Sequence, residues 1–144
     1  MQWSEKERSV GYLVKRVQQG LRRRCDAALK PTGLSMAQYA ALRALAEHPD
    51  ASAAELARLC FVTRQSLQDL LTGLRTAGLV ETVDAPPRGR ARSLRLTRRG
   101  SRQLNAADDA VFGVEAVMLQ GISTSARRSV AEALTNCAEN LERS

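Results

Sequence analysis

The chain has 144 residues and a formal charge of +7 at pH 7, with 44% hydrophobic but only 3% aromatic residues. This length suits one domain with a proper core, and the predominance of Ala, Leu and Val among the apolar residues favours a mainly α fold. No run of 18 apolar residues is present, which argues against a membrane span. The first twenty residues lack the apolar core of a secretory signal, so we expect a cytoplasmic protein without a membrane partner.

Cysteine and histidine usage argues against a disulfide framework and against a metal site. Cys25, Cys60 and Cys137 are odd in number, far apart and not in CxxC pairs, as expected in a reducing cytosol. Cys60 and Cys137 fall on apolar helix positions, where we expect them to pack in the core. His48 is the only histidine, and no second ligand stands at a suitable spacing. We expect no metal and no cofactor.

The first half of the chain reads as four helices. Apolar residues recur at helical spacing over residues 10–28, and Pro31 ends this long amphipathic helix. Two capping boxes open the next helices, Ser35 with Gln38 for residues 35–47 and Ser52 with Glu55 for residues 52–59. Thr63 is the predicted N-cap of a fourth helix, and Gly78 is predicted to end that helix.

The second half reads as a hairpin followed by two helices. Residues 79–83 and 92–96 are predicted strands, joined by a loop rich in Pro, Gly and Arg over 84–91. Thr97 is expected to cap a long helix that runs to about Leu119, and a last helix covers residues 124–142. The chain is therefore predicted to contain six helices and one hairpin.

A short capped helix, a tight turn, a helix that starts with polar residues and a basic hairpin follow one another in the order of a winged helix-turn-helix. In that fold the second helix enters the DNA major groove N-terminus first. Arginine can bind guanine and glutamine can bind adenine, while hydroxyl groups suit phosphates. We therefore expect base reading from Arg64, Gln65, Ser66 and Gln68, and phosphate contacts from Thr63 and Ser52.

The hairpin and the start of the helix that follows it carry the excess charge of the chain. Seven arginines and no acidic residue lie between residues 88 and 102, and the remaining 15 basic and 15 acidic residues cancel. Guanidinium groups on a β-ribbon suit a polyanion laid along it. Double-stranded DNA is therefore the expected partner, with Arg88, Arg90 and Arg92 at the tip of the hairpin, the wing.

Beyond this pattern, the sequence resembles the MarR family of transcriptional regulators. The resemblance rests on Leu56-Ala57, Thr63-Arg64-Gln65-Ser66, Leu74, Gly78-Leu79-Val80 and Leu96-Thr97-Arg98-Arg99-Gly100, and the helices flanking this segment also occur in the family. It implies a homodimeric repressor of a pseudo-palindromic operator. Residues 1–34 and 101–144 would form the dimerisation helices around a winged module at 35–100. Amphipathic helices outside that module agree with this, because they carry more apolar surface than a lone winged helix needs.

The sequence departs from the family pattern at two positions. An Asp-x-Arg pair usually stiffens the family's wing, but here Arg88 stands at the Asp position before Arg90, and Asp84 is the alternative acidic partner. Repulsion among the arginines suggests a mobile wing tip that orders on DNA, and the expected target is the narrow minor groove of A/T tracts, which attracts inserted arginines. The second departure is Phe61, which stands where the family often has glycine in the turn between the two DNA-binding helices.

The family resemblance also implies a small anionic or phenolic effector, bound between the dimer layer and the DNA module. Tyr12, Tyr39 and Arg43, together with Trp3, are the candidates for lining that site, although Tyr39 alone fits a core position better. A different sensor would be Cys25, because three preceding arginines would favour its thiolate. Its place on an apolar stripe instead favours simple packing.

An enzyme is not indicated. The sequence has no nucleophile–base pair, no glycine-rich phosphate loop and no metal cluster, and Asp108-Asp109 reads as solvated charge. The alternatives of another class are a winged helix for protein–protein contact and a non-specific architectural DNA binder. Sequence preference separates the last from a regulator, which prefers its site by roughly 10³ or more.

Overall fold

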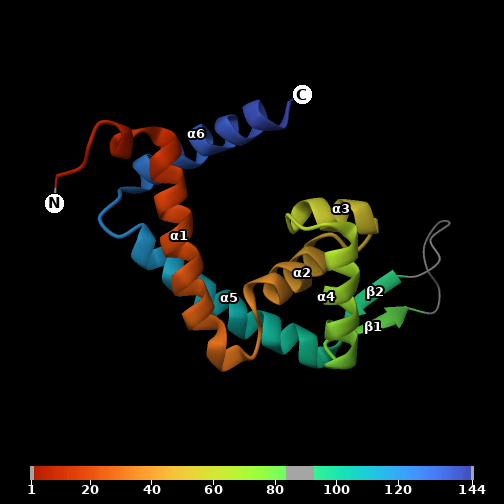
Figure 1. Ribbon diagram of the computed structural model, residues 1–144. Helices are drawn as coiled ribbons and strands as arrows, with labels where there is room; N and C mark the ends of the chain where they lie inside the picture. The colour runs from red at the N-terminus through yellow and green to blue at the C-terminus, as the bar shows by residue number, and fades with distance from the viewer. Residues whose placement is uncertain (1, 84–92, 144) are drawn as a thin grey trace.

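The computed structural model describes residues 2–83 and 93–143 and confirms the predicted elements within them (Figure 1). Its six α-helices begin within two residues of their predicted starts. In chain order the elements are η1 (Lys6–Arg8), α1 (Val10–Leu29), η2 (Lys30–Thr32), α2 (Met36–Glu47), α3 (Ala53–Leu59), α4 (Arg64–Thr76), β1 (Val80–Val83), β2 (Ser93–Leu96), α5 (Arg98–Met118) and α6 (Thr124–Glu142). None of the described helices is long and apolar enough to cross a membrane.

The helices divide between two ends of the molecule, and α5 runs from one end to the other. α1 crosses α5 at one end, whereas α2, α3, α4 and the two strands gather around the beginning of α5 at the other (Figure 1). β1 and β2 pair antiparallel, with Val80 opposite Leu96 and Val83 opposite Ser93. The order of α3, turn, α4 and hairpin is that of a winged helix-turn-helix, as the sequence predicts.

Side-chain caps fix where the helices begin. The Ser35 side chain accepts a hydrogen bond from the backbone N–H of Gln38, and the Ser52 side chain accepts one from the backbone N–H of Glu55. In turn, the side chains of Gln38 and Glu55 accept from the backbone N–H groups of Ser35 and Ser52. Thr63 caps α4 in the same way through the N–H of Ser66. Each cap satisfies a backbone donor that the helix cannot, which is worth about 1 kcal/mol. Both predicted capping boxes are confirmed.

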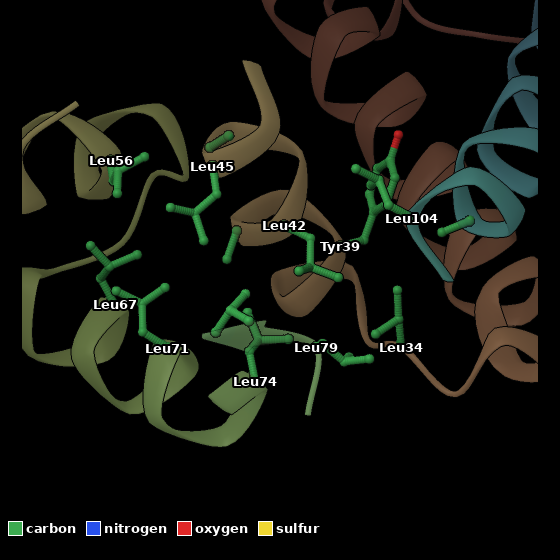
Figure 2. Close-up of a cluster of buried hydrophobic side chains, with 14 of the residues drawn as sticks. Leu34, Tyr39, Leu42, Leu45, Leu56, Leu67, Leu71, Leu74, Leu79 and Leu104 are labelled. Carbon is green, nitrogen blue, oxygen red and sulfur yellow. The ribbon is translucent and has the colours of Figure 1, made fainter. Parts of the chain in front are cut away.

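The core is centred on the winged module and is built mainly of leucine and alanine. One side of α2 packs onto the apolar faces of α3 and α4, and the beginning of α5 closes the cluster (Figure 2). The residues labelled there are Leu34, Tyr39, Leu42, Leu45, Leu56, Leu67, Leu71, Leu74, Leu79 and Leu104. Burying each leucine contributes about 1.5–3 kcal/mol, so α4 is held rigidly by one face while its opposite face stays exposed.

A tight junction joins the hairpin to α5. The Thr97 hydroxyl donates to the carbonyl of Gly78 at 2.7 Å and accepts from the N–H of Gly100 at 3.0 Å. The Thr97 N–H donates to the carbonyl of Leu79. A Cβ atom on Gly100 would lie 2.0 Å from the Leu79 oxygen, so only glycine permits this approach. The geometry of these contacts therefore explains the threonine and the glycine of the Leu-Thr-x-x-Gly segment.

Large apolar side chains of α1, α5 and α6 remain exposed, away from the leucine core. None of the 19 residues of α6 is buried, although the helix has an apolar stripe. The exposed side chains come from three helices and are Val10, Leu13, Val14 and Val17 of α1, Phe112, Val117 and Met118 of α5, and Val130, Leu134 and Leu141 of α6. A single chain thus leaves uncovered a surface of the kind that marks an interface.

Replacing Gly100 should test the junction. We expect Gly100→Ala to lower the free energy of unfolding by about 1–3 kcal/mol or more, because its methyl group meets the Leu79 carbonyl and the backbone must shift. The matched control is Gly73→Ala in α4, where nothing lies within 4 Å of the added carbon; it should stabilise the helix by about 0.5–1 kcal/mol. Urea unfolding at equal protein concentration measures both. Equal stability of Gly100→Ala and the parent would refute the close contact.

Candidate nucleic-acid interface

The N-terminus of α4 presents a row of polar side chains, and the structure separates them into two sets. The side chains of Arg64 and Gln68 are exposed and make no hydrogen bond or ion pair within the described residues. One helical turn separates them, so both project from the same face. These two side chains are therefore available to a ligand without breaking any contact of the folded chain.

The other members of the predicted reading set already have partners. The Gln65 amide donates to the Asp69 carboxylate at 3.2 Å, one turn further along α4. The Thr63 hydroxyl, besides capping the helix, donates to the Ser66 hydroxyl at 3.0 Å. All of these side chains are exposed. Asp69 was not among the sequence-predicted residues; its spacing of four from Gln65 was the available signal.

Ser52 is positioned by α3 rather than by α4. Its hydroxyl oxygen accepts the Glu55 N–H at 3.1 Å, and its backbone N–H donates to the Glu55 carboxylate at 3.2 Å. The hydroxyl hydrogen remains the group able to donate to a phosphate oxygen. A helix N-terminus also carries partial positive charge, which favours an anion there.

The turn between α3 and α4 carries an unusual residue. Phe61 has a φ of 57°, in the left-handed region, and it is the one non-glycine residue with positive φ among those described. The turn is closed by the N–H of Val62, which donates to the Ala57 carbonyl at 3.0 Å. The predicted frame of the motif is therefore intact although glycine is absent. A bulky residue in this conformation costs roughly 1–2 kcal/mol.

One wing arginine has a partner that the sequence did not reveal. Arg95 of β2 pairs with Glu81 of β1 at 2.9 Å, directly across the hairpin. Both side chains are exposed, so the pair contributes at most about 1 kcal/mol; it holds the strands in register and neutralises one of the seven arginines. Arg88, Arg90 and Arg92 lie outside the described residues, as does Asp84.

A polar cluster links α2 to α5 and corrects the expectation that Asp108 is solvated. The Tyr39 hydroxyl donates to Asp108 at 2.8 Å, and Arg43 donates to the same carboxylate. Arg43 also pairs with Glu47 at 2.9 Å and lies over the ring of Phe112. Asp108 is therefore not solvated charge, as its place beside Asp109 had indicated. Its side chain is only 19% exposed.

The predicted effector residues lie in two places rather than one. Tyr39 and Arg43 line one groove of about 260 Å³ along α2, whereas Tyr12 lines a different one on α1. The Trp3 ring lies 4.1 Å from the guanidinium carbon of Arg16, which lines the same groove as Tyr12. Tyr39 is buried and engaged by Asp108, which confirms the interpretation of Tyr39 as a core residue.

Two of the three cysteines pack as predicted, and the redox alternative for Cys25 is contradicted. Cys25 is 1% exposed, and Cys60 is partly buried against the core. Burial, followed by the charges of Asp26 and Glu115, raises the pKa of the Cys25 thiol, the opposite of the direction predicted from the preceding arginines. Burial raises the pKa of the Cys60 thiol as well. Cys137 is exposed in the single chain rather than packed in a core. No three metal-ligating side chains gather among the described residues.

The fold and the polar row on α4 define a winged helix-turn-helix DNA-binding protein, and comparison with known proteins gives its family. The sequence model of the MarR family matches residues 32–91. The HTH-type transcriptional repressor Rv2887 of Mycobacterium tuberculosis H37Rv is 35% identical over 119 residues, which cover 83% of this chain and 86% of the relative. The chain belongs to the MarR family of transcriptional regulators.

Solved structures agree with this assignment. The DNA complex of the M. tuberculosis MarR family protein Rv2887 aligns with a TM-score of 0.71 and 33% identity, covering 90% of this chain and 97% of the other. The complex of the same protein with salicylic acid has a TM-score of 0.73, covering 90% and 96%. The fold is also that of MepR from S. aureus in its DNA complex, at a TM-score of 0.83, 18% identity and coverage of 96% and 100%.

Titration of Tyr39 should test the cluster with Asp108. Burial, with the hydrogen bond and negative charge of Asp108, raises the pKa of Tyr39 to about 12. The raised pKa favours the protonated phenol in the folded chain, so protonated Tyr39 contributes to the free energy of unfolding. This contribution should be full below about pH 10 and lost as the pH rises towards 12. The chain has two tyrosines, so phenolate absorbance of a Tyr12→Phe variant reports Tyr39 alone.

The native midpoint should lie near 12 and fall in the Asp108→Asn background, whereas the urea-unfolded protein should titrate near 10. A native midpoint near 10 would show that Tyr39 is not buried against Asp108.

Proposed function

We propose that the protein is a dimeric repressor that reads a pseudo-palindromic operator through α4. The observation that carries this proposal is the row of Arg64 and Gln68, which is exposed and without partners in the described chain at the N-terminus of α4. These side chains match the major-groove edges of guanine and adenine. The relative Rv2887 supports the proposal, because it is named a transcriptional repressor and has been solved with DNA.

The contacts divide by position. Arg64 and Gln68 bind bases directly, while Gln65 binds a base on exchanging or sharing its bond to Asp69. The hydroxyl groups of Ser66, Thr63 and Ser52 lie beside helix N-termini, where they contact bases or phosphates. Arg88, Arg90 and Arg92 of the wing contact the adjacent minor groove, an assignment that rests on sequence alone because these residues lie outside the described part of the chain.

Dimerisation is supported by the uncovered helices. α6 buries none of its residues against its own chain, and α1 and α5 expose further apolar side chains beside it. A second copy would cover this surface, so residues 1–34 and 101–144 act as dimerisation helices and residues 35–100 as the reading module. A two-fold axis then places two copies of α4 about one DNA turn apart, roughly 34 Å.

Selection of binding sites from random duplex DNA tests this function directly. At near-physiological salt we expect a pseudo-palindrome whose half-sites are one helical turn apart, preferred over random DNA by roughly 10³ or more. Salt-sensitive binding without a motif would instead establish an architectural DNA binder. No binding to any duplex would refute both and favour a protein partner.

Variants of α4 should separate base reading from general affinity. We expect Arg64→Ala and Gln68→Ala each to cost about 1–3 kcal/mol on the selected operator and to relax preference at one base pair per half-site. Arg75→Ala, an exposed arginine at the C-terminal end of α4, is the matched control and should change operator preference little. Equal losses on operator and random DNA for the reading variants would contradict their assignment, as would equal effects of the control. Competition binding measures both ratios.

We also propose that a small aromatic carboxylate releases the protein from DNA. A groove of about 360 Å³ between α1 and α5 has apolar walls and is rimmed by Arg16, Arg23 and Arg24. An apolar surface with a few convergent charged groups suits an aromatic anion. The salicylic acid complex of Rv2887 supports this ligand class.

Salicylate should therefore weaken operator binding in a mobility-shift titration. In Arg23→Ala we expect about tenfold more salicylate for half-release, because one charge-assisted hydrogen bond is lost. Arg22→Ala removes a neighbouring arginine outside the groove and should behave like the parent. Unchanged operator binding at saturating salicylate would exclude this effector for the chain.

A further inference from the structure

Phe61 has no partner among residues 2–83 and 93–143 that would explain its presence in the turn. Its side chain is 90% exposed, the most exposed large hydrophobic residue among those described. Its backbone occupies the left-handed region at φ 57°, which glycine or asparagine would adopt at lower cost. The phenyl ring therefore stabilises the folded chain neither by burial nor through its backbone. A group that is strained and solvated in the free protein has its favourable contact elsewhere.

The position of Phe61 limits where that contact lies. Phe61 stands two residues before Thr63, the N-cap of α4. Consecutive Cα atoms are 3.8 Å apart, so the Phe61 backbone lies within about 8 Å of the helix start. The major groove is about 12 Å wide, and the proposed function places this end of α4 inside it. The ring is thus within reach of the groove that Arg64 and Gln68 enter.

The chemistry of the groove selects one target for a phenyl ring. Base edges in the major groove are hydrogen-bond donors and acceptors, with the exception of the thymine 5-methyl group. A phenyl ring has no hydrogen-bonding atom, so it gains free energy only by covering that methyl group and excluding water from it. The polar residues that follow the turn have no comparable apolar surface.

We propose that Phe61 is a specificity-determining residue that covers the methyl group of a thymine in each operator half-site, beside the bases bound from α4. This inference rests on the proposed function. It adds an apolar contact from the turn to the polar contacts from the helix. The strained backbone of Phe61 is compatible with this role, because the ring is 90% exposed and stands two residues before the N-cap of α4.

Replacing thymine by uracil tests this proposal, because uracil lacks only the methyl group. Each operator thymine is replaced in turn, symmetrically in both half-sites, and affinity is measured for the full-length protein and two variants. Phe61→Asn removes the ring and keeps a residue that tolerates the left-handed region. Phe61→Leu keeps an apolar side chain at the same position. Thermal unfolding and sedimentation of each variant accompany the binding data.

For the parent we expect uracil at one position to weaken binding about fourfold per half-site, the effect of withdrawing one methyl group from an apolar contact. Phe61→Asn should be at least as heat-stable as the parent and remain dimeric. It should bind the thymine operator more weakly and be insensitive to uracil at that position. Phe61→Leu should retain part of the uracil effect.

Other outcomes overturn the proposal. A uracil effect that is the same in the parent and in Phe61→Asn would mean that another residue covers the methyl group, and a flat scan would mean that none does. Dissociation of Phe61→Asn into monomers would identify the ring as an interface residue between copies. Failure of the parent to select an operator would refute the proposed function, which separates that failure from failure of this inference.

Discussion

The contact between Gly100 and Leu79 is the constraint on which the arrangement of the molecule depends. The Thr97 hydroxyl donates to the Gly78 carbonyl and accepts from the Gly100 N–H, and the Thr97 backbone N–H donates to the Leu79 carbonyl, so these bonds all meet at one residue. The end of α4, the base of the hairpin and the beginning of α5 are thereby fixed to one another. α5 then continues to α1 at the other end of the molecule. The connection between α5 and α4 is therefore a packed junction rather than a flexible linker.

The second connection between the two ends of the molecule is polar, and it joins α2 to α5 through side chains that differ in burial. Asp108 of α5 holds the buried Tyr39 and the half-buried Arg43 of α2, so one carboxylate joins these two helices. Geometry that is fixed by a few directed hydrogen bonds changes in discrete steps, because a buried polar group left without a partner costs about 1–3 kcal/mol. The leucine core on the other side of α2 has no such directionality. The contact of α2 with α5 therefore combines the hydrogen bonds of Asp108 with apolar packing against Leu104 and Ala107, whereas the position of α4 on α2 is set by packing.

Local features of the fold were predictable from the sequence, and long-range pairs were not. The caps at Ser35, Ser52 and Thr63 act within four residues, so the sequence displays both partners together. Helical periodicity likewise showed which face of α4 is apolar. Tyr39 and Asp108 are 69 residues apart, and Glu81 and Arg95 are 14 apart, so their pairing follows only from the tertiary packing. The same limit explains Cys25, whose arginine neighbours are adjacent in sequence but exposed in the structure, while burial determines its thiol.

The parts of the chain that do not contribute to its own stability have a common character. α6 has an apolar stripe and no buried residue, Phe61 combines exposure with a left-handed backbone, and Arg64 and Gln68 project without partners. A sequence optimised only for folding of the single chain would place polar residues on α6 and glycine in the turn. Each exception lies where a second molecule is expected: apolar where another copy would pack, and polar with one aromatic ring where DNA would lie. Because these groups lie on one rigid frame, the proposed association of two chains would fix the spacing of the two copies of α4.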